Sequence, residues 1–303
     1  MSNHSHSHSQ PGHNHHQETD NIKLAFFLNL SFTIIEIIGG VLTNSIAILS
    51  DALHDLGDSL SLGLSWYLEN YSQKDADKNF SFGYARFSLL GALINSLVLI
   101  IGSFFILFEA VPRIFNPQTV HPRGMLVLAI FGIVINGISV FKLRGGSSLN
   151  NKVVSWHLLE DVLGWTAVLI VSIVLLFRDL PILDPLLSIF IMTYVLYNVI
   201  SNLKQVLNIF LQGVPKGFNI EEIQEKIKAN TASLSVHHTH IWSLEGEKIF
   251  LSTHVVIKNE LDKTEIINLK SQIKSLLAAE GIDHVTVEIE YADEECESKN
   301  LEL

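Results

Sequence analysis

Six long apolar segments fill the first two thirds of this 303-residue chain and constrain its fold more than any other feature. Each is close to the ~20 residues that a helix needs to cross the hydrocarbon core of a bilayer. Gly, Pro and Asn mark the breaks between the segments. The sequence therefore predicts an all-α six-helix transmembrane bundle, with spans at about 22–43, 46–69, 86–110, 123–143, 153–177 and 184–208.

The distribution of Lys and Arg predicts the orientation of these spans. An even number of spans places both ends of the chain on one side, where the segments near the membrane carry eight Lys or Arg, against three on the other side. Basic residues gather on the cytoplasmic side of a membrane. We therefore expect a multi-pass integral membrane protein of a bacterial inner membrane with both termini in the cytoplasm. The first span is expected to act as an uncleaved membrane signal.

Residues 1–21 form a low-complexity head with six histidines, His4, His6, His8, His13, His15 and His16. Its His, Ser, Asn and Gln cannot bury a core, so we expect the head to be disordered. Three interpretations stay open: the head gathers metal ions, it is a solvated tail, or it is a partly artificial leader.

A small cytoplasmic domain is predicted over 212–292, after the membrane domain at 22–211 and before an acidic tail at 293–303. Two amphipathic helix patterns and three alternating strand patterns follow in the order helix–strand–strand–helix–strand, at 220–229, 236–243, 249–257, 264–279 and 285–289. This order predicts a compact α+β domain with both helices on one face of the sheet.

Charge and cysteine content exclude several functions. From residue 213 onward the chain has 17 Asp or Glu against 9 Lys or Arg. Phosphate binding needs a basic face, so nucleic acid is not an expected partner. An acidic surface suits cation handling, although a merely solvated surface would have the same composition. Cys296 is the single cysteine, which excludes an intramolecular disulfide and a Cys-x-x-Cys metal site.

The spacing His-x-x-x-Asp occurs twice inside the predicted spans, at His54 and Asp58 and at His157 and Asp161. Residues four apart share one face of a helix, so each pair directs an imidazole and a carboxylate to the same point. Ionisable side chains are costly in a bilayer and usually line a substrate or ion path. Two imidazoles and two carboxylates can complete a tetrahedral shell around a divalent metal. The alternative is two separate His–Asp hydrogen bonds that hold helices together.

The types of ligand narrow the identity of the metal. Imidazole suits zinc, cobalt, copper, iron and nickel, whereas all-oxygen sites suit magnesium, calcium or manganese. With no thiolate in this set, copper(I) is disfavoured. We expect zinc first, with cobalt, cadmium or iron(II) as the alternative main substrate.

These residues and several shorter motifs resemble the cation diffusion facilitator family, in particular its zinc-transporting branch, over about residues 22–291. The supporting matches are Ser81-Phe82-Gly83, Glu109-x-x-x-Arg113-x-x-x-Pro117, Asp184-Pro185, Gly213-Val214-Pro215 and His237-x-x-His240-Ile241-Trp242. The resemblance implies proton-coupled export of zinc-like ions by a homodimer in the lipid bilayer, with a cytoplasmic ferredoxin-like domain in each subunit. Zinc is then the transported substrate and a regulatory ligand, and no organic cofactor is expected.

The resemblance also implies a second metal site in the cytoplasmic domain. Residues of relatives at the positions of His237, His254, Glu288 and Glu290 bind metal, and His240 is a further candidate. Carboxylates in place of histidines would make this site harder and weaker. The alternative is a set of solvated polar residues at strand ends.

Other polar residues are expected to be peripheral. Some members of the family bind another metal in the loop between the second and third spans, with histidine near the Phe-Gly element. That histidine is lacking here and Asp77 stands alone, so no tight site is expected in the loop. His238 has no evident partner and is expected at the surface, while Asp55 and Glu160 lie on other helix faces as candidates for interhelical hydrogen bonds.

Competition between metal and protons for the same ligands would couple the two fluxes, because ligands bind metal in the deprotonated form. The unperturbed pKa of histidine, about 6.5, allows either state near neutral pH. A membrane metalloenzyme is a lesser alternative, since the chain has no His-Glu-x-x-His and four protein ligands leave no position for a catalytic water. A membrane metal sensor without flux is the other.

Overall fold

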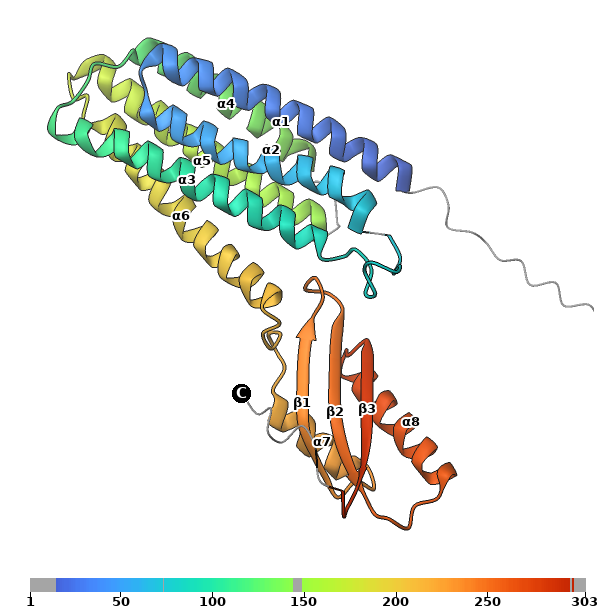
Figure 1. Ribbon diagram of the computed structural model, residues 1–303. Helices are drawn as coiled ribbons and strands as arrows, with labels where there is room; N and C mark the ends of the chain where they lie inside the picture. Colours follow the sequence, from blue (N-terminus) through green and yellow to red (C-terminus); the bar gives the residue numbers. More distant parts are fainter. Residues whose placement is uncertain (1–14, 73, 144–148, 295, 297–303) are drawn as a thin grey trace, which may run out of the picture. The chain divides into compact units, whose positions relative to one another are not determined.

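Six long helices precede a smaller domain of helices and strands in the computed structural model (Figure 1), which describes residues 15–72, 74–143, 149–294 and 296. The chain divides into two compact units. One comprises the residues up to 70 together with 91–202, and the other comprises 71–90 together with the chain from 203 onward.

The six long helices extend beyond the predicted spans, mostly at the polar ends. They are α1 (His15–Thr43), α2 (Ile46–Ser72), α3 (Phe87–Phe115), α4 (Pro122–Leu143), α5 (Leu149–Phe177) and α6 (Leu183–Phe210). The start of α1 corrects the expectation for the head, because residues 15–21 are helical. A helix, once nucleated, adds one hydrogen bond per residue and can continue past the end of its apolar stretch. Residues 1–14 lie outside the described part.

Four of these helices contain a stretch that is long and apolar enough to cross a membrane, among the residues that the structure describes. The stretches are Phe26–Thr43, Phe87–Phe115, Leu158–Phe177 and Leu183–Phe210, and α4 has a shorter apolar stretch, Pro122–Ile138. Helix α2 differs from these because it carries four acidic residues. It is also the helix on which the first predicted pair of metal ligands lies.

Helix α2 packs into two separate apolar clusters of the bundle. Ile46 lies in one cluster with residues of α3 and α6, and Ile48 lies in the other with residues of α1, α4 and α5. Both side chains are fully buried. Gly132 of α4 lets the second cluster close, because a Cβ at this position would overlap the indole of Trp165 on α5. Burial on both sides fixes the rotation of α2 and therefore the direction of its polar side chains.

Two of the shorter motifs hold the ends of these helices. The buried carboxylate of Asp184 at the start of α6 accepts hydrogen bonds from Ser45 Oγ and, at 2.8 Å, from the backbone N–H of Ile46. It thereby accepts hydrogen bonds at the N-terminus of α2, where the backbone N–H groups have no partner within the helix. Arg113 at the end of α3 donates to the backbone and side-chain oxygens of Asn44, both at 3.1 Å, and pins the turn between α1 and α2.

The smaller domain has the predicted order of elements. Its elements are α7 (Ile220–Asn230), β1 (Ser235–Ser243), β2 (Ile249–Ile257), α8 (Lys263–Ala279) and β3 (His284–Tyr291). The sheet order is β1-β2-β3, with β1 antiparallel and β3 parallel to β2. Asn219 caps α7, and Asp262 and Glu265 form a capping box on α8. The five predicted elements are confirmed, with ends within two residues.

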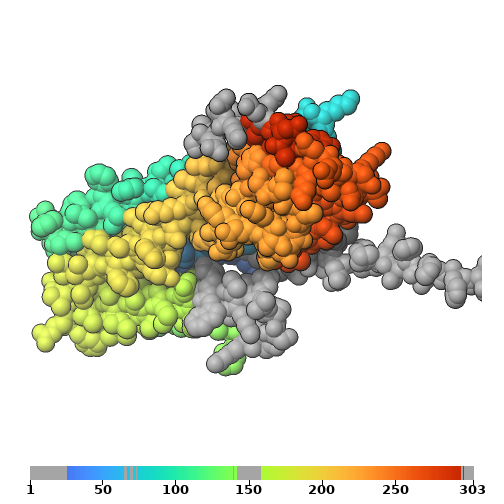
Figure 2. Space-filling model, turned by 90° about the horizontal axis from the view of Figure 1, so that it is seen from below, coloured from blue at the N-terminus to red at the C-terminus, as the bar shows by residue number. Residues whose placement is uncertain are grey.

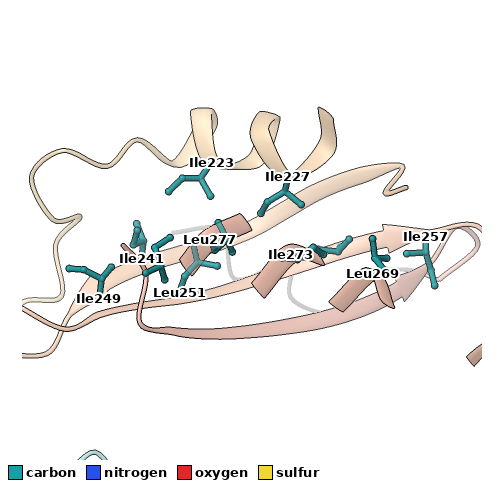
Figure 3. Close-up of a cluster of buried hydrophobic side chains, with 11 residues drawn as sticks. Ile223, Ile227, Ile241, Ile249, Leu251, Ile257, Leu269, Ile273 and Leu277 are labelled. Atoms are coloured by element: carbon teal, nitrogen blue, oxygen red, sulfur yellow. The ribbon is translucent and has the colours of Figure 1, made fainter. Parts of the chain in front are cut away.

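One apolar core joins both helices to one face of the sheet. Figure 3 shows Ile223 and Ile227 of α7 directed toward the strands, with Leu277 of α8 among the side chains below them. Alternate residues of β2, such as Leu251 and Ile257, face this core. In Figure 2 the atoms of this domain, orange to red, gather into one continuous body. The opposite face of the sheet carries the polar residues His254 and Glu290 together with the stacked rings of Trp242 and Phe250.

Candidate metal centres

The first predicted pair lies on one face of α2. His54 Nε2 and Asp58 Oδ2 are 3.8 Å apart, and their side chains are 27% and 29% exposed. The four-residue spacing in an unbroken helix is what places them together. The two groups are close enough to share one ion after a small adjustment of their rotamers.

The second pair lies on α5, a helix that approaches α2 near Asp51. A Cβ on Gly164 of α5 would lie 3.3 Å from Asp51 Oδ1 of α2, so the two helices approach closely at this level. Asp161 lies three residues before Gly164 and within electrostatic range of Asp51 and Asp55. His157 is on the same helix, and its side chain lies outside the described residues.

Three further carboxylates lie buried beside these residues. Glu36 of α1 is 1% exposed, and Asp51 and Asp55 are each 6% exposed. The carboxyl group of Glu36 lies within electrostatic range of those of Asp55 and Asp51. The sequence analysis did not predict a role for Glu36. Its position as an acidic residue within the apolar first span could have indicated one. The interhelical role predicted for Glu160 is confirmed, since it accepts a hydrogen bond of 2.9 Å from Tyr194 of α6.

The face of the sheet opposite the apolar core brings together residues of the predicted cytoplasmic site. Glu290 of β3 lies between two histidines, with Oε1 2.6 Å from His254 Nδ1 and Oε2 3.1 Å from His237 Nε2. His254 is directly opposite His237 in the register of β1 and β2. Three potential ligands for a divalent metal, two imidazoles and one carboxylate, therefore meet at one point.

A β-bulge in β1 makes this arrangement possible. The register shifts between His237 and His240, and His238 has a left-handed backbone with φ of +48°. One extra residue reverses the alternation of side chains along a strand. His237 and His240 therefore face the same side despite their odd spacing.

His238 and His240 form a separate pair next to the cluster. Their Nε2 atoms are 3.2 Å apart, and the ring centre of His238 lies 4.8 Å from that of His254. The prediction that His238 has no partner was therefore wrong, because the bulge turns its half-buried ring toward neighbouring histidines. Burial, followed by the charges of His238 and His254, lowers the pKa of His240, which favours the neutral form.

Cys296 is the residue of this cluster that sequence reasoning missed. Its Sγ lies 3.5 Å from His254 Nδ1, and its side chain is buried. Ligand atoms of His237, His254, Glu290 and Cys296 all lie within 4.8 Å of one another. The position of Cys296, six residues after Glu290, was the only signal in the sequence.

The electrostatics of the cluster keep its central carboxylate ionised. Burial raises the pKa of Glu290, but hydrogen bonds from His254 and Cys296 and the charge of His237 lower it more, so the net pKa lies below the ordinary value. Glu288 is peripheral to the cluster. Its Oε2 lies 3.3 Å from His254 Nε2, on the other side of that ring, and its side chain is 66% exposed.

Asp77 has a structural role in the loop between α2 and α3. Its Oδ1 accepts hydrogen bonds from the backbone N–H groups of Asn79 and Phe80, and its Oδ2 accepts one of 2.7 Å from the Tyr84 hydroxyl. The Tyr84 bond, followed by the backbone bonds, lowers the pKa of Asp77. Both carboxylate oxygens are therefore used to close the loop.

A membrane domain of apolar helices is followed by a small domain with a cluster of His, Glu and Cys side chains of the kinds that bind metal. These features are those of a multi-pass membrane protein that handles metal cations. The family model for the cation efflux transmembrane domain matches residues 22–211. The model for the cation efflux protein cytoplasmic domain matches residues 215–292. The chain belongs to the cation diffusion facilitator family and is of its zinc-transporting type.

Several bacterial proteins named as metal transporters are similar along nearly the whole chain. The cadmium, cobalt and zinc/H(+)-K(+) antiporter of Bacillus subtilis (strain 168) is 34% identical over 285 residues, 92% of each chain. The metal cation efflux system protein CzcD of Cupriavidus metallidurans is 35% identical over 290 residues, 95% of this chain and 90% of the relative. The zinc transporter ZitB of Escherichia coli (strain K12) is 30% identical over 296 residues, 95% of this chain and 92% of the relative.

Proposed function

We propose that this protein exports divalent metal cations from the cytoplasm, zinc first, in exchange for protons. The two His-x-x-x-Asp pairs carry the proposal, with α5 packed against α2 beside them. His54, Asp58, His157 and Asp161 would hold one ion between the helices. The names of relatives agree with this substrate class, since they include zinc, cadmium and cobalt transporters.

The carboxylates make transport of a dication across a bilayer feasible. Asp58 and Asp161 would neutralise its charge, which burial away from water otherwise opposes. When the site opens to the cytoplasm, the ligands lose protons and bind metal. When it opens to the other side, they regain protons and release metal, so an inward proton gradient drives export.

The proposed assembly is a homodimer in a bacterial inner membrane, with six spans per subunit and both termini in the cytoplasm. The match to a cytoplasmic domain model and the α+β elements after residue 212 support a ferredoxin-like domain. We propose that metal at the His237, His254 and Glu290 cluster regulates the dimer. The acidic surfaces of the two subunits repel each other, and a bound cation would reduce this repulsion. A ligand that binds one state of a protein stabilises that state, here the dimer.

Zinc flux into vesicles containing the purified protein tests the proposal. Zinc uptake should follow an imposed proton gradient and vanish when the gradient is collapsed. Flux that is insensitive to the gradient would contradict proton coupling, and saturable binding without flux would favour a sensor. A competition assay that counts transported zinc, cobalt, cadmium and iron would identify the main substrate.

A further inference from the structure

We propose that the thiolate of Cys296 is a ligand of the cytoplasmic cluster and makes it a four-ligand site for zinc- or cadmium-like cations. This proposal builds on the regulatory site proposed above and names the class of metal that it takes. The ligand set would be two imidazole nitrogens, one carboxylate oxygen and one sulfur. It revises the expectation of a hard, weakly binding site, because thiolate selects softer cations.

The distances in the cluster fit a tetrahedral shell. With metal–nitrogen bonds of about 2.1 Å and metal–sulfur bonds of about 2.3 Å, neighbouring ligand atoms lie roughly 3.4–3.7 Å apart. Cys296 Sγ is 3.5 Å from His254 Nδ1, and His237 Nε2 is 3.1 Å from Glu290 Oε2. All four ligand atoms lie within 4.8 Å of one another. His254 Nδ1 and Glu290 Oε1, now 2.6 Å apart, would have to separate to admit an ion. The most distant ligand atoms would have to approach by up to about 1 Å.

Burial supports a site that retains its ion. His254, Glu290 and Cys296 are 9%, 5% and 8% exposed, so water competes little for the metal. His237 Nε2 is enclosed and lacks a well-aligned hydrogen bond among the described residues, despite its approach to Glu290. An ion would give this nitrogen a partner. As it binds, the metal replaces the Cys296 S–H proton, which leaves to solvent.

The single cysteine of the chain gives this proposal an unambiguous signal. A thiolate-to-metal charge-transfer band on the full-length protein can come only from Cys296. The experiment is a titration of the reduced, purified protein with cobalt(II) and, separately, cadmium(II). We expect a charge-transfer band that saturates at one thiolate per subunit, with cadmium displacing cobalt.

Variants locate the band. Cys296→Ser and His254→Ala should abolish it, and Cys296→Ser should weaken cadmium binding at the cluster on the order of 10-fold to 100-fold. His284→Ala is the matched control on β3, outside the cluster, and should keep the band. His54→Ala should also keep it, so failure of the transport site and failure of this proposal are distinguishable.

A measurement on the unaltered protein covers the case in which Cys296→Ser does not fold. Bound zinc should slow the reaction of the thiol with a disulfide reagent by at least tenfold relative to the metal-free protein. Equal rates with and without zinc would overturn the proposal. Cobalt bands that depend on His254 but include no sulfur charge transfer would overturn it as well.

Discussion

The two candidate metal centres differ in how the chain builds them and in how tightly they are enclosed. His54 and Asp58 come from one turn of α2, are more than a quarter exposed, and lie 3.8 Å apart. The cytoplasmic cluster joins different strands. The side chains of its central pair, His254 and Glu290, are 11% and 7% exposed and lie 2.6 Å apart. Loosely paired, accessible groups suit an ion that must leave, whereas a buried and hydrogen-bonded cluster suits an ion that stays.

Removal of a proposed transport ligand should give the largest difference between the two centres, because only transport should be lost. Asp58→Ala deletes a carboxylate that we propose neutralises the dication, so zinc flux in vesicles should fall by about 100-fold or more. Cobalt binding at the cytoplasmic cluster should be unchanged. Glu109→Gln is the control, since its carboxylate pairs with Arg113 at the end of α3. Normal flux in Asp58→Ala would show that the ion follows another path.

Loss of core packing should lower the stability of the cytoplasmic domain. Ile273 of α8 is fully buried in the core, so Ile273→Ala should destabilise the domain by about 2–5 kcal/mol through lost burial and a cavity. Hydrogen exchange of β2 amides in the full chain measures this change. Ile267→Ala on the same helix is the control, because Ile267 is 56% exposed. Similar protection in both variants would mean that Ile273 is not a core residue.

The cap on α2 should have an intermediate effect on the membrane domain. Asp184→Ala leaves Ser45 Oγ and the N–H of Ile46 without their buried acceptor, at a cost of about 1–3 kcal/mol. Asp184→Asn keeps one acceptor oxygen and should lose less. Thermal unfolding of the detergent-purified protein should therefore rank the wild type above Asn and Asn above Ala. An unchanged melting temperature in Asp184→Ala would show that another group caps α2.

The contrast between the sites also explains what could be predicted from the sequence. The pairs on α2 and α5 follow from a local rule, that residues four apart share a helix face. Strand alternation likewise placed Glu288 and Glu290 on the polar side of β3. Strand alternation fails at His237 and His240, because the bulge at His238 adds a residue to β1 and no local sequence pattern predicts it. Cys296 and Glu36 reach their neighbours through long-range packing, which spacing along the chain does not encode.

The smallest predicted effect is that of Glu288→Gln on metal affinity, and it tests which nitrogen of the His254 ring binds the ion. Nδ1 faces Glu290 and Cys296, whereas Nε2 faces Glu288. Because Glu288 is 66% exposed, solvent screens its pairing, and Glu288→Gln should change the cobalt affinity of the cluster by no more than about threefold.

Glu290→Gln is the matched comparison, and its effect should be much larger, because Glu290 is buried and contacts both histidines. Titration of the two variants with cobalt measures the difference. If Glu288→Gln weakened binding as much as Glu290→Gln, the ion would lie on the Nε2 side of His254, out of reach of Cys296. The regulatory site would then be as open as the pair on α2, and enclosure would no longer distinguish the centre that retains metal from the one that releases it.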